Sequence, residues 1–538
     1  MKENNYIAKK YLKIKYNNYK NFLKYYYIEK DIFYSKMLKV MSNYLNLYND
    51  KKFTQSQWNL LIGPWLHSIT SIYLNYEYNI KKLKINPDII KIENIKPFKD
   101  DSDYREKICD LKVNLFIIKF FKTKKLINFD FSFISNKKKK FKKDKKVFRI
   151  IIKVYIWLLS LLKIKNFHIN AKFNIRDSVL LFLKSRMKIA LLPSFVHRLE
   201  IHDNISYDFI KRSTTFKELS LHKNIKKKAY LIISLMPKIY LEGYKFLEEN
   251  NFLKNYKHAE KFITTTSYID DEIFKNILVN LKNKNNKIKI HLMQHGGHFN
   301  LFDYKIHSYH ENIISNKFFS WGSKQNGYIP MPSTRINRYI KDKKKYFLKK
   351  NIKSICYVCP PLKLYDFQSD FFHNSNSKKI LFKRKKFIES INSKINLICR
   401  PYYQKRYTHQ IKVDKNISKK KFKISKNNQY LFNSNLIVFE YFSSMIFEII
   451  NLNIPFIIIS DHKDYKFSSF GLKLINKMKR ENILFSDPVK ASNFINENFD
   501  DINNWWYEKN NFINQIKKKT ALISDDYLNE WNRNILNY

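Results

Sequence analysis

A histidine set between a glutamine and two glycines is the segment best suited to chemistry. Gln294-His295-Gly296-Gly297 directly follows an alternating apolar segment, residues 287–293. We therefore expect it at the carboxyl end of a strand, where open α/β sheets place their ligands. There His295 can serve as a general base or donate a hydrogen bond to a phosphate, and the paired glycines let the backbone approach a ligand closely. The structural alternative is a tight turn with a histidine packed beside it.

Histidines are concentrated around the same segment. Four of the 14 histidines lie between residues 295 and 310, namely His295, His298, His307 and His310. Histidine clusters can ligate a metal ion, but this spacing is irregular and lacks both an HExxH pattern and a companion cysteine. No DxD pattern stands beside an expected strand. The sequence therefore favours His295 as a base and predicts no metal site.

Two serines form a second candidate segment. Ser443 and Ser444 follow the apolar run "NLIVFEY" and open an expected helix, whose first N–H groups and dipole suit a phosphate. Simple N-capping is the alternative. Glu448 lies one helical turn further along the same face. Arg400, at the end of the apolar run "INLIC", is either a surface arginine or a bidentate ligand for the same phosphate.

Two series of alternating strands and helices position these segments. In the first series, residues 261–267 and 317–323 are expected strands, and residues 270–284 form an expected helix. After a basic linker at 335–352, the second series has strands at "SICYVCP", "INLICRPY", "NLIVFEY" and "PFIIISD". Residues 427–460 contain no lysine or arginine, although 102 such residues in 538 give an expectation of about six in 34. The second series is therefore predicted to hold a parallel sheet buried on both faces.

The remaining segments predict a helical N-terminal part. Residues 1–135 alternate amphipathic helical stretches with short apolar strands, and Pro64 is expected in the first turn of a helix. The run "IIIKVYIWLLSLL" at 150–162 is too short to span a bilayer, and we expect a buried core helix, with an interfacial helix as the alternative. The lysine-rich residues 137–146 are expected to form an exposed insertion, with a membrane-facing role as the alternative.

Composition excludes several function classes. The chain has only seven glycines, and none forms a Rossmann fingerprint, a Walker A loop or a kinase glycine-rich loop. The net charge of +56 accompanies an excess of lysine, asparagine, isoleucine and tyrosine typical of AT-rich coding, so a solvated basic surface explains most of it. The partners that remain are a phosphate-bearing substrate, an anionic membrane face and, last, nucleic acid. Four cysteines and an N-terminus without an apolar run predict a reducing, cytoplasmic location.

A resemblance to a known family rests on an ordered set of motifs. These are "GPWL" at 63–66, "QHGG" at 294–297, "HENIIS" at 310–315 with "FFSWG" at 318–322, "SSMIFEIINLNIPFII" at 443–458 and "WW" at 505–506. The set resembles transferases of bacterial surface-carbohydrate biosynthesis with a GT-B-like layout. The region after "FEY" is also similar to the nucleotide-phosphate region of CDP-glycerol glycerophosphotransferases.

The resemblance implies roles for individual residues. His295 takes the place of a candidate base, Ser443 and Ser444 bind phosphate, and Glu448 matches an acidic position that contacts a ribose or sugar hydroxyl. The family usually has Ser-Asp before the Trp-Gly strand, whereas this chain has Ser315-Asn316. Loss of that aspartate leaves His295 and Glu311 as the candidates for the base. The chain also has Phe299-Asn300 in place of Tyr-Gly, and Ser323 in place of a second tryptophan.

The expected architecture is α/β and GT-B-like, with two Rossmann-type domains facing a cleft. Residues 1–335 would form an acceptor-side domain, residues 353–500 a nucleotide-donor domain, and residues 505–538 a helical tail. The donor phosphate would also be contacted by Arg400 and, from the first domain, by Gly296 and Gly297. The expected activity is transfer of a sugar or related group from a nucleotide-activated donor to a cell-surface glycan or lipid-linked glycan, with no further cofactor and no nucleic acid. Contact with the anionic inner face of the membrane is expected to be peripheral. A non-catalytic nucleotide- or glycan-binding protein and a basic nucleic-acid binder are the alternatives.

Overall fold

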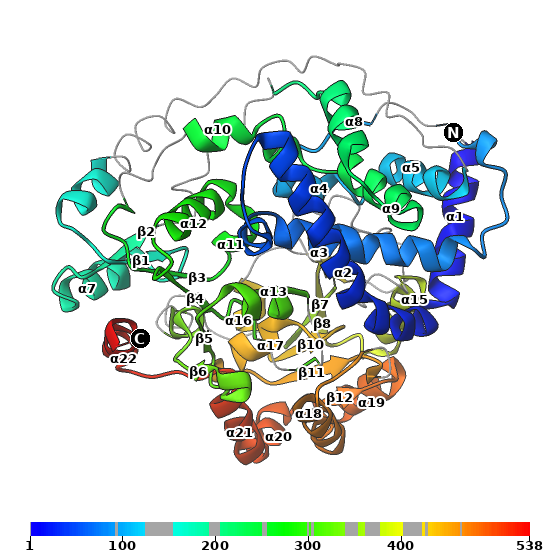
Figure 1. Cartoon of the computed structure of the whole chain (residues 1–538). Coiled ribbons are helices and arrows are strands. Elements are labelled where there is room, and N and C mark those ends of the chain that lie inside the picture. Colours follow the sequence, from blue (N-terminus) through cyan, green and yellow to red (C-terminus); the bar gives the residue numbers. More distant parts are fainter. Residues whose placement is uncertain are drawn as a thin grey trace.

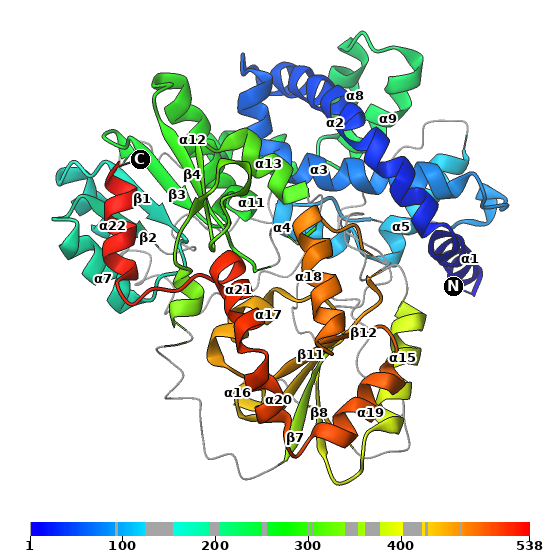
Figure 2. The ribbon, with the colours of Figure 1, turned by 90° about the horizontal axis from the view of Figure 1, so that it is seen from below.

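Two parallel sheets organise the molecule (Figures 1 and 2). The structure is a computed structural model that describes residues 2–91, 95–123, 154–192, 205–249, 256–297, 301–302, 306–338, 340, 353–360, 377–401, 422–424, 429–462 and 465–537. Each sheet has six strands, and every pairing between neighbouring strands is parallel. Helices lie beside both sheets, so the GT-B-like arrangement of two Rossmann-type domains expected from the sequence is confirmed.

The first sheet has the strand order β2-β1-β3-β4-β5-β6. Its strands are β1 Asn166–Ile169, β2 Ile189–Leu192, β3 Lys261–Thr264, β4 Lys289–Met293, β5 Lys317–Ser320 and β6 Ile329–Pro330. The strands expected near 261, 287 and 317 are β3, β4 and β5. Sequence analysis missed β1, β2 and β6, which are four residues long or shorter and carry little periodic signal.

The second sheet has the strand order β12-β11-β10-β7-β8-β9. Its strands are β7 Ser354–Val358, β8 Asn396–Arg400, β9 Lys423–Ile424, β10 Leu436–Phe439, β11 Phe456–Ile459 and β12 Leu484–Phe485. All four strands expected in this half are present as β7, β8, β10 and β11. Every residue of β10 and β11 is buried, as the absence of lysine and arginine from 427–460 predicts.

Helices dominate the N-terminal part, and most of them lie to one side of the first sheet in both views (Figures 1 and 2). They are α1 Lys2–Asn17, α2 Tyr19–Asn49, α3 Gln55–Ile80, α4 Asp101–Lys107, α5 Leu111–Lys122, α8 Phe209–Glu218, α9 Lys223–Ser234 and α10 Tyr244–Glu249. The described residues before 124 contain no strand, so the short apolar strands expected within 1–135 are wrong. A short apolar run cannot be assigned from periodicity alone, and here such runs lie within buried helices.

Pro64 lies in the interior of α3 and not in its first turn, which corrects the sequence-based expectation. The helix begins two turns earlier, where Thr54 and Gln57 form a reciprocal capping box. Proline removes one helical hydrogen bond, but Trp58 and Trp65 on either side are fully buried. Burial of these large side chains outweighs the lost hydrogen bond and keeps the helix continuous.

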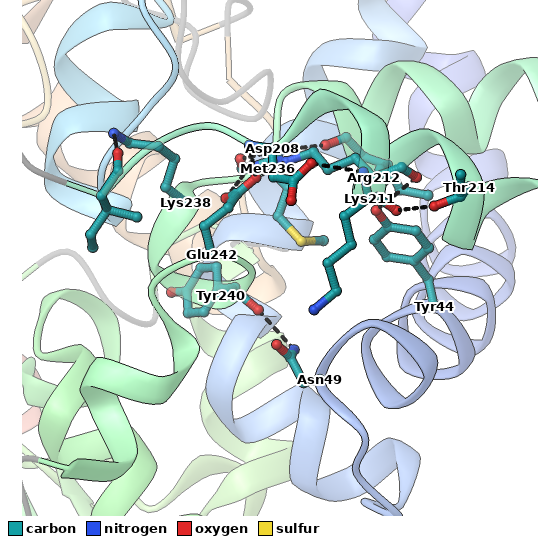
Figure 3. Close-up of polar contacts among 12 residues, drawn as sticks. Tyr44, Asn49, Asp208, Lys211, Arg212, Thr214, Met236, Lys238, Tyr240 and Glu242 are labelled. Carbon is teal, nitrogen blue, oxygen red and sulfur yellow. Dashed lines mark hydrogen bonds and ion pairs between the residues drawn. The ribbon is translucent and has the colours of Figure 1, made fainter.

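A buried arginine joins the N-terminal helices (Figure 3). The guanidinium of Arg212, on α8, makes two hydrogen bonds of 2.7 and 2.8 Å to the carboxylate of Glu242. It also donates to the carbonyl oxygens of Ile233 and Met236 at the end of α9. Tyr44 on α2 donates to the backbone oxygen of Arg212. The charged group is thus paired and hydrogen-bonded, as a buried ion must be.

The other helices surround the two sheets. In the first domain they are α7 Ile175–Lys184, α11 Ser267–Asp270, α12 Glu272–Lys284 and α13 Ile306–Ile314. In the second they are α15 Ser377–Ser390, α16 Gln429–Asn433, α17 Ser444–Ile449, α18 Ser469–Arg480 and α19 Pro488–Asn498, and in the tail α20 Ile502–Glu508, α21 Asn510–Thr520 and α22 Tyr527–Asn537. Part of the expected linker, residues 335–338, is helical, and 341–352 lie outside the described residues.

The helical tail crosses from the second domain back to the first (Figure 2). Trp506 on α20 packs on Phe456 of the second sheet, with ring centroids 4.9 Å apart. Trp531 on α22 packs 5.2 Å from Phe319 of the first sheet and donates to the oxygen of Pro332. The tail therefore contacts the cores of both domains.

Residues 154–161 form a helix whose outer face is apolar and exposed. Val154, Trp157, Leu158 and Leu161 are exposed, which makes the expected buried core helix wrong. Ile156 and Leu159, on the opposite face, are buried and attach the helix to the domain. The lysine-rich segment 137–146 lies outside the described residues. None of the helices in the described part of the chain combines the length and the hydropathy needed to cross a bilayer.

A histidine in the first sheet should make stability depend on pH. His168 on β1 is fully buried near Trp531, and burial, followed by the nearby charges of His291 and Lys261, lowers its pKa to about 3. The folded protein keeps His168 neutral, while the unfolded chain takes up a proton below about pH 6.5. The contribution of His168 to the free energy of unfolding should therefore be constant above pH 6.5. Below pH 6.5 it should fall by about 1.4 kcal/mol per pH unit.

Urea unfolding at pH 7 and pH 5 checks this expectation. The variant His168→Leu should lose about 2 kcal/mol less than the wild type between these two pH values. A variant of the exposed His222, His222→Asn, is the matched control and should keep the wild-type dependence. Equal losses in the wild type and His168→Leu would contradict the prediction.

Candidate functional site

A buried glutamine fixes the turn that carries His295. The backbone N–H of Gln294 donates to Phe319 on β5 over 2.8 Å, and its side chain donates to Gly296 O and accepts from Trp321 N–H. The "QHGG" turn is thereby attached to the "FFSWG" strand. His295 lies directly past the end of β4 with 30% of its side chain exposed. This is the strand-end position expected from the sequence, and it leaves the imidazole accessible.

A carboxylate stands behind the imidazole. Nδ1 of His295 lies 3.7 Å from Oε1 of Glu311 on α13, and Glu311 is almost fully buried. Tyr268 on α11 donates its hydroxyl hydrogen to the same Oε1. A carboxylate beside Nδ1 favours the tautomer with its proton there and stabilises the imidazolium ion after Nε2 takes up a proton. Glu311 thus lies next to His295, as a positioning residue would.

The residue before Glu311 is also buried and packs against α3. The neighbouring His310 is fully buried, and burial, followed by the charge of Lys275, lowers its pKa to about 3, so it stays neutral. Its ring packs against Gly63 on α3, where a Cβ atom would lie 2.2 Å from Cε1 of His310. Only glycine permits this approach. The motifs "GPWL" and "HENIIS", far apart in the sequence, therefore meet behind His295.

The candidate phosphate-binding residues gather at the carboxyl end of the second sheet. Ser443 is the N-cap of α17 and accepts from Met445 N–H over 3.2 Å, while Ser444 is the half-buried first residue of that helix. Arg400 is the last residue of β8. Burial raises the pKa of Tyr441 to about 12, although a hydrogen bond with Ser443 and the charge of Arg400 lower this pKa. Only β7 separates β8 from β10 in the sheet, so Arg400 and the serine turn lie at the same edge, two strands apart.

The two domains touch at the candidate residues. A Cβ atom at Gly297 would lie 2.3 Å from Cβ of Phe447 on α17, so the "QHGG" turn rests on the helix that Ser443 opens. Close by in sequence, Glu448 is buried and forms an ion pair of 3.2 Å with Arg335 from the segment after β6. The strand ends of the two sheets therefore face each other at this contact.

Comparison with known proteins identifies the family. The family model described as LIC12162 family transferase matches residues 10–535. The chain belongs to the LIC12162 family of transferases. As a member of this family, the protein is a transferase. No curated protein sequence matches it significantly.

Solved structures show distant similarity to this LIC12162 family transferase. MnaA of S. aureus, solved with UDP, has 10% identity, a TM-score of 0.39 and coverage of 70% of this chain and 96% of its own. The wall teichoic acid polymerase TagF has 12% identity, a TM-score of 0.35 and coverage of 74% and 98%. MurG of Acinetobacter baumannii has 7% identity, a TM-score of 0.32 and coverage of 70% and 100%. At these TM-scores, no residue role or substrate transfers to this chain.

The LIC12162 family transferase has two further polar residues at the site that sequence analysis missed. Tyr268 contacts Glu311, and Arg335 contacts Glu448. Both partnerships are tertiary, and the only sequence signal for Arg335 is an arginine in a chain that prefers lysine. His298 lies outside the described residues. Among the residues that the structure does describe, no group of three or more His, Cys, Asp and Glu side chains is arranged to hold a metal ion.

Proposed function

We propose that this LIC12162 family transferase moves a sugar or a related group from a nucleotide-activated donor to a cell-surface glycan or lipid-linked glycan acceptor. An activated donor already carries its leaving group, so the protein must supply a base for the acceptor hydroxyl and donors for the departing phosphate. The contact of Gly297 with Phe447 carries the proposal, since it sets the turn of His295 against the helix opened by Ser443 and Ser444. The first domain would hold the acceptor and the second the donor.

Each residue has a role that its position allows. His295 accepts the proton of the acceptor hydroxyl at Nε2, and Glu311 stabilises the resulting imidazolium ion. Ser443 accepts from Met445 N–H and also hydrogen-bonds Tyr441, so donation to the donor phosphate would turn its hydroxyl hydrogen away from Tyr441. Ser444 and Arg400 add a hydroxyl and a guanidinium to the same phosphate.

Two parts of the site face the rest of the donor. Gly296 and Gly297 keep side chains away from the turn that approaches it. Glu448 accepts from a ribose or sugar hydroxyl, which requires that hydroxyl to replace or share its ion pair with Arg335. Arg335 would then be near the leaving phosphate, where its charge favours departure.

A thermal-shift screen tests the proposal. Nucleotide sugars, CDP-alcohols and oligonucleotides are compared at matched concentrations. A true donor at a hundred times its Kd should stabilise the fold by about 2.7 kcal/mol. Stabilisation by nucleotide sugars or CDP-alcohols, followed by transfer to an acceptor, supports the proposal. Binding without turnover would indicate a non-catalytic binding protein, and stabilisation by oligonucleotides alone would indicate a nucleic-acid binder.

Removal of one serine hydroxyl should weaken donor binding modestly. Ser444→Ala is expected to weaken donor binding by about 1–2 kcal/mol, because one hydrogen bond to a charged group is lost. Isothermal titration with the donor found in the screen measures this change. Ser486→Ala, at an exposed position after β12, is the matched control and should bind as the wild type does. An unchanged Kd for Ser444→Ala would exclude the Ser444 hydroxyl as a phosphate ligand.

Transfer is expected to be independent of a divalent metal. In the proposed site, Arg400, Arg335 and the serine hydroxyls neutralise the departing phosphate, which is the role that a metal plays in other transferases. Turnover measured with the identified donor should therefore be the same with and without EDTA. Loss of turnover in EDTA that Mn²⁺ or Zn²⁺ restores would instead assign the histidine segment to a metal.

A further inference from the structure

An apolar stripe on the surface of the first domain is left exposed by the residues that the structure describes. Val154, Trp157, Leu158, Leu161 and Leu162 are each between 46% and 58% exposed. Their spacing of three and four residues places them on one side of the helix at 154–161 and the turn that follows it. Soluble proteins rarely present such a continuous apolar row to water, and rows of this kind mark an interaction surface. We call these five residues the outward stripe.

A second exposed apolar row lies at the same end of the molecule. Ile175, Val179 and Leu183 on α7 are 84%, 51% and 60% exposed and are spaced four residues apart. The segment 154–161 runs into β1 and α7 runs into β2, and these two strands pair in parallel from Asn166 and Ile189 onward. The carboxyl ends of both helices are therefore brought together at the amino ends of β1 and β2, on the edge of the sheet that Figure 1 shows beside α7.

Cations flank the place where the carboxyl ends of the two helices come together, which we call the corner. Lys163 follows the outward stripe, and Arg186 and Lys188 follow α7, all three exposed. Lys188 is held beside β1, since its backbone oxygen accepts from Asn166 over 3.1 Å. Lys165 adds a fourth cation, paired at 2.7 Å with Glu260. An exposed tryptophan-leucine row edged by lysine and arginine is the pattern of a helix that lies at a membrane interface.

We propose that the outward stripe and the cations beside it dock this transferase onto the surface of a bilayer that contains anionic lipids. A protein partner fits less well, because the cores of protein interfaces are depleted of lysine. The apolar side chains enter the boundary between headgroups and acyl chains, and the cations stay at the level of the lipid phosphates. The corner lies at the amino ends of the strands, whereas His295 lies past the carboxyl end of β4. Docking is thus independent of the proposed transfer chemistry.

Vesicle co-sedimentation of the full chain tests the proposal. Vesicles of equimolar phosphatidylglycerol and phosphatidylcholine are compared with vesicles of phosphatidylcholine alone. The wild type should sediment with the anionic vesicles, and high salt should weaken this binding because it screens the cations. The double variant Trp157→Ser/Leu161→Ser should bind at least about tenfold more weakly, since two large apolar side chains no longer enter the lipid.

The controls separate docking from loss of folding. Phe382→Ser/Leu472→Ser removes two exposed apolar side chains from the second domain and should bind as the wild type does. Leu162→Glu places a repelling charge in the outward stripe and gives an independent test, with the melting temperature measured for every variant. The proposal is overturned if the wild type does not bind vesicles, or if it binds both vesicle types equally. It is also overturned if the stripe variants bind as the wild type does. Self-association that the stripe variants abolish, without vesicle binding, would assign the surface to a second copy of this chain.

Discussion

Replacement of His295 by alanine is expected to lower kcat by ~10²–10⁴-fold while the KM for the donor changes little. The imidazole lies past the end of β4, is accessible, and has the carboxylate of Glu311 at Nδ1. In the proposed reaction it takes the proton of the acceptor hydroxyl as the new bond forms. Its contribution is therefore made in the transition state and not in the ground state, which is why kcat falls and KM does not.

Variants of the residues behind His295 refine this expectation. Glu311→Gln keeps the shape of the side chain but removes its charge, so the imidazolium ion loses its partner and kcat should fall by a smaller factor than in His295→Ala. Tyr268→Phe removes only the hydroxyl that holds Glu311 and should have the smallest effect of the three. The loss of kcat should thus be largest for His295→Ala, smaller for Glu311→Gln and smallest for Tyr268→Phe. A base with two supporting residues requires this order.

The matched control is a histidine at the opposite end of the same sheet. His258 lies before the start of β3, so His258→Ala should keep the kcat of the wild type. Steady-state kinetics with the identified donor and acceptor measure all four variants. A kcat for His295→Ala within a few-fold of the wild type would exclude His295 as the base. An increase in donor KM with unchanged kcat would make it a phosphate ligand instead.

The fold was predictable where burial leaves a strong pattern in the sequence. β10, β11 and the helix α17 between them lie in the longest stretch where this lysine-rich chain avoids lysine and arginine. The edge strands β2, β6, β9 and β12, and β1 beside β2, escaped prediction because two to four residues without such a burial pattern carry no usable period. The outward stripe was assigned to the core for a related reason. Apolar spacing shows that a helix has an apolar face, but not whether protein or another medium covers that face.

The candidate site was predictable one segment at a time, but not as an assembly. His295, Ser443 and Ser444 each follow a recognisable strand, so their strand-end positions could be inferred from local pattern. Arg335 could not be found in this way, since its ion pair with Glu448 exists only when the two domains meet. Contacts that join distant segments depend on side-chain packing in three dimensions, which no local spacing encodes.

Replacement of Arg384 by alanine is expected to destabilise the second domain by about 3–5 kcal/mol. Arg384 on α15 is buried, and its guanidinium hydrogen-bonds both carboxylate oxygens of Glu440, with contacts of 2.6 to 3.2 Å. Loss of the arginine leaves the Glu440 carboxylate buried without its opposite charge, which costs far more than the loss of an exposed ion pair. The melting temperature of the second domain should fall by roughly 6–20 °C.

Two further variants show whether the isolated charge is the cause. Lys385→Ala removes the next cation along α15, which is exposed and 3.8 Å from Glu389, and should change stability by no more than about 0.5 kcal/mol. Arg384→Met/Glu440→Leu removes both buried charges and should recover most of the stability lost in Arg384→Ala. If the double variant is as unstable as the single one, packing and not charge explains the loss. Because Glu440 directly precedes the turn of Tyr441 and Ser443, Arg384→Ala should also weaken donor binding at temperatures where the domain is still folded.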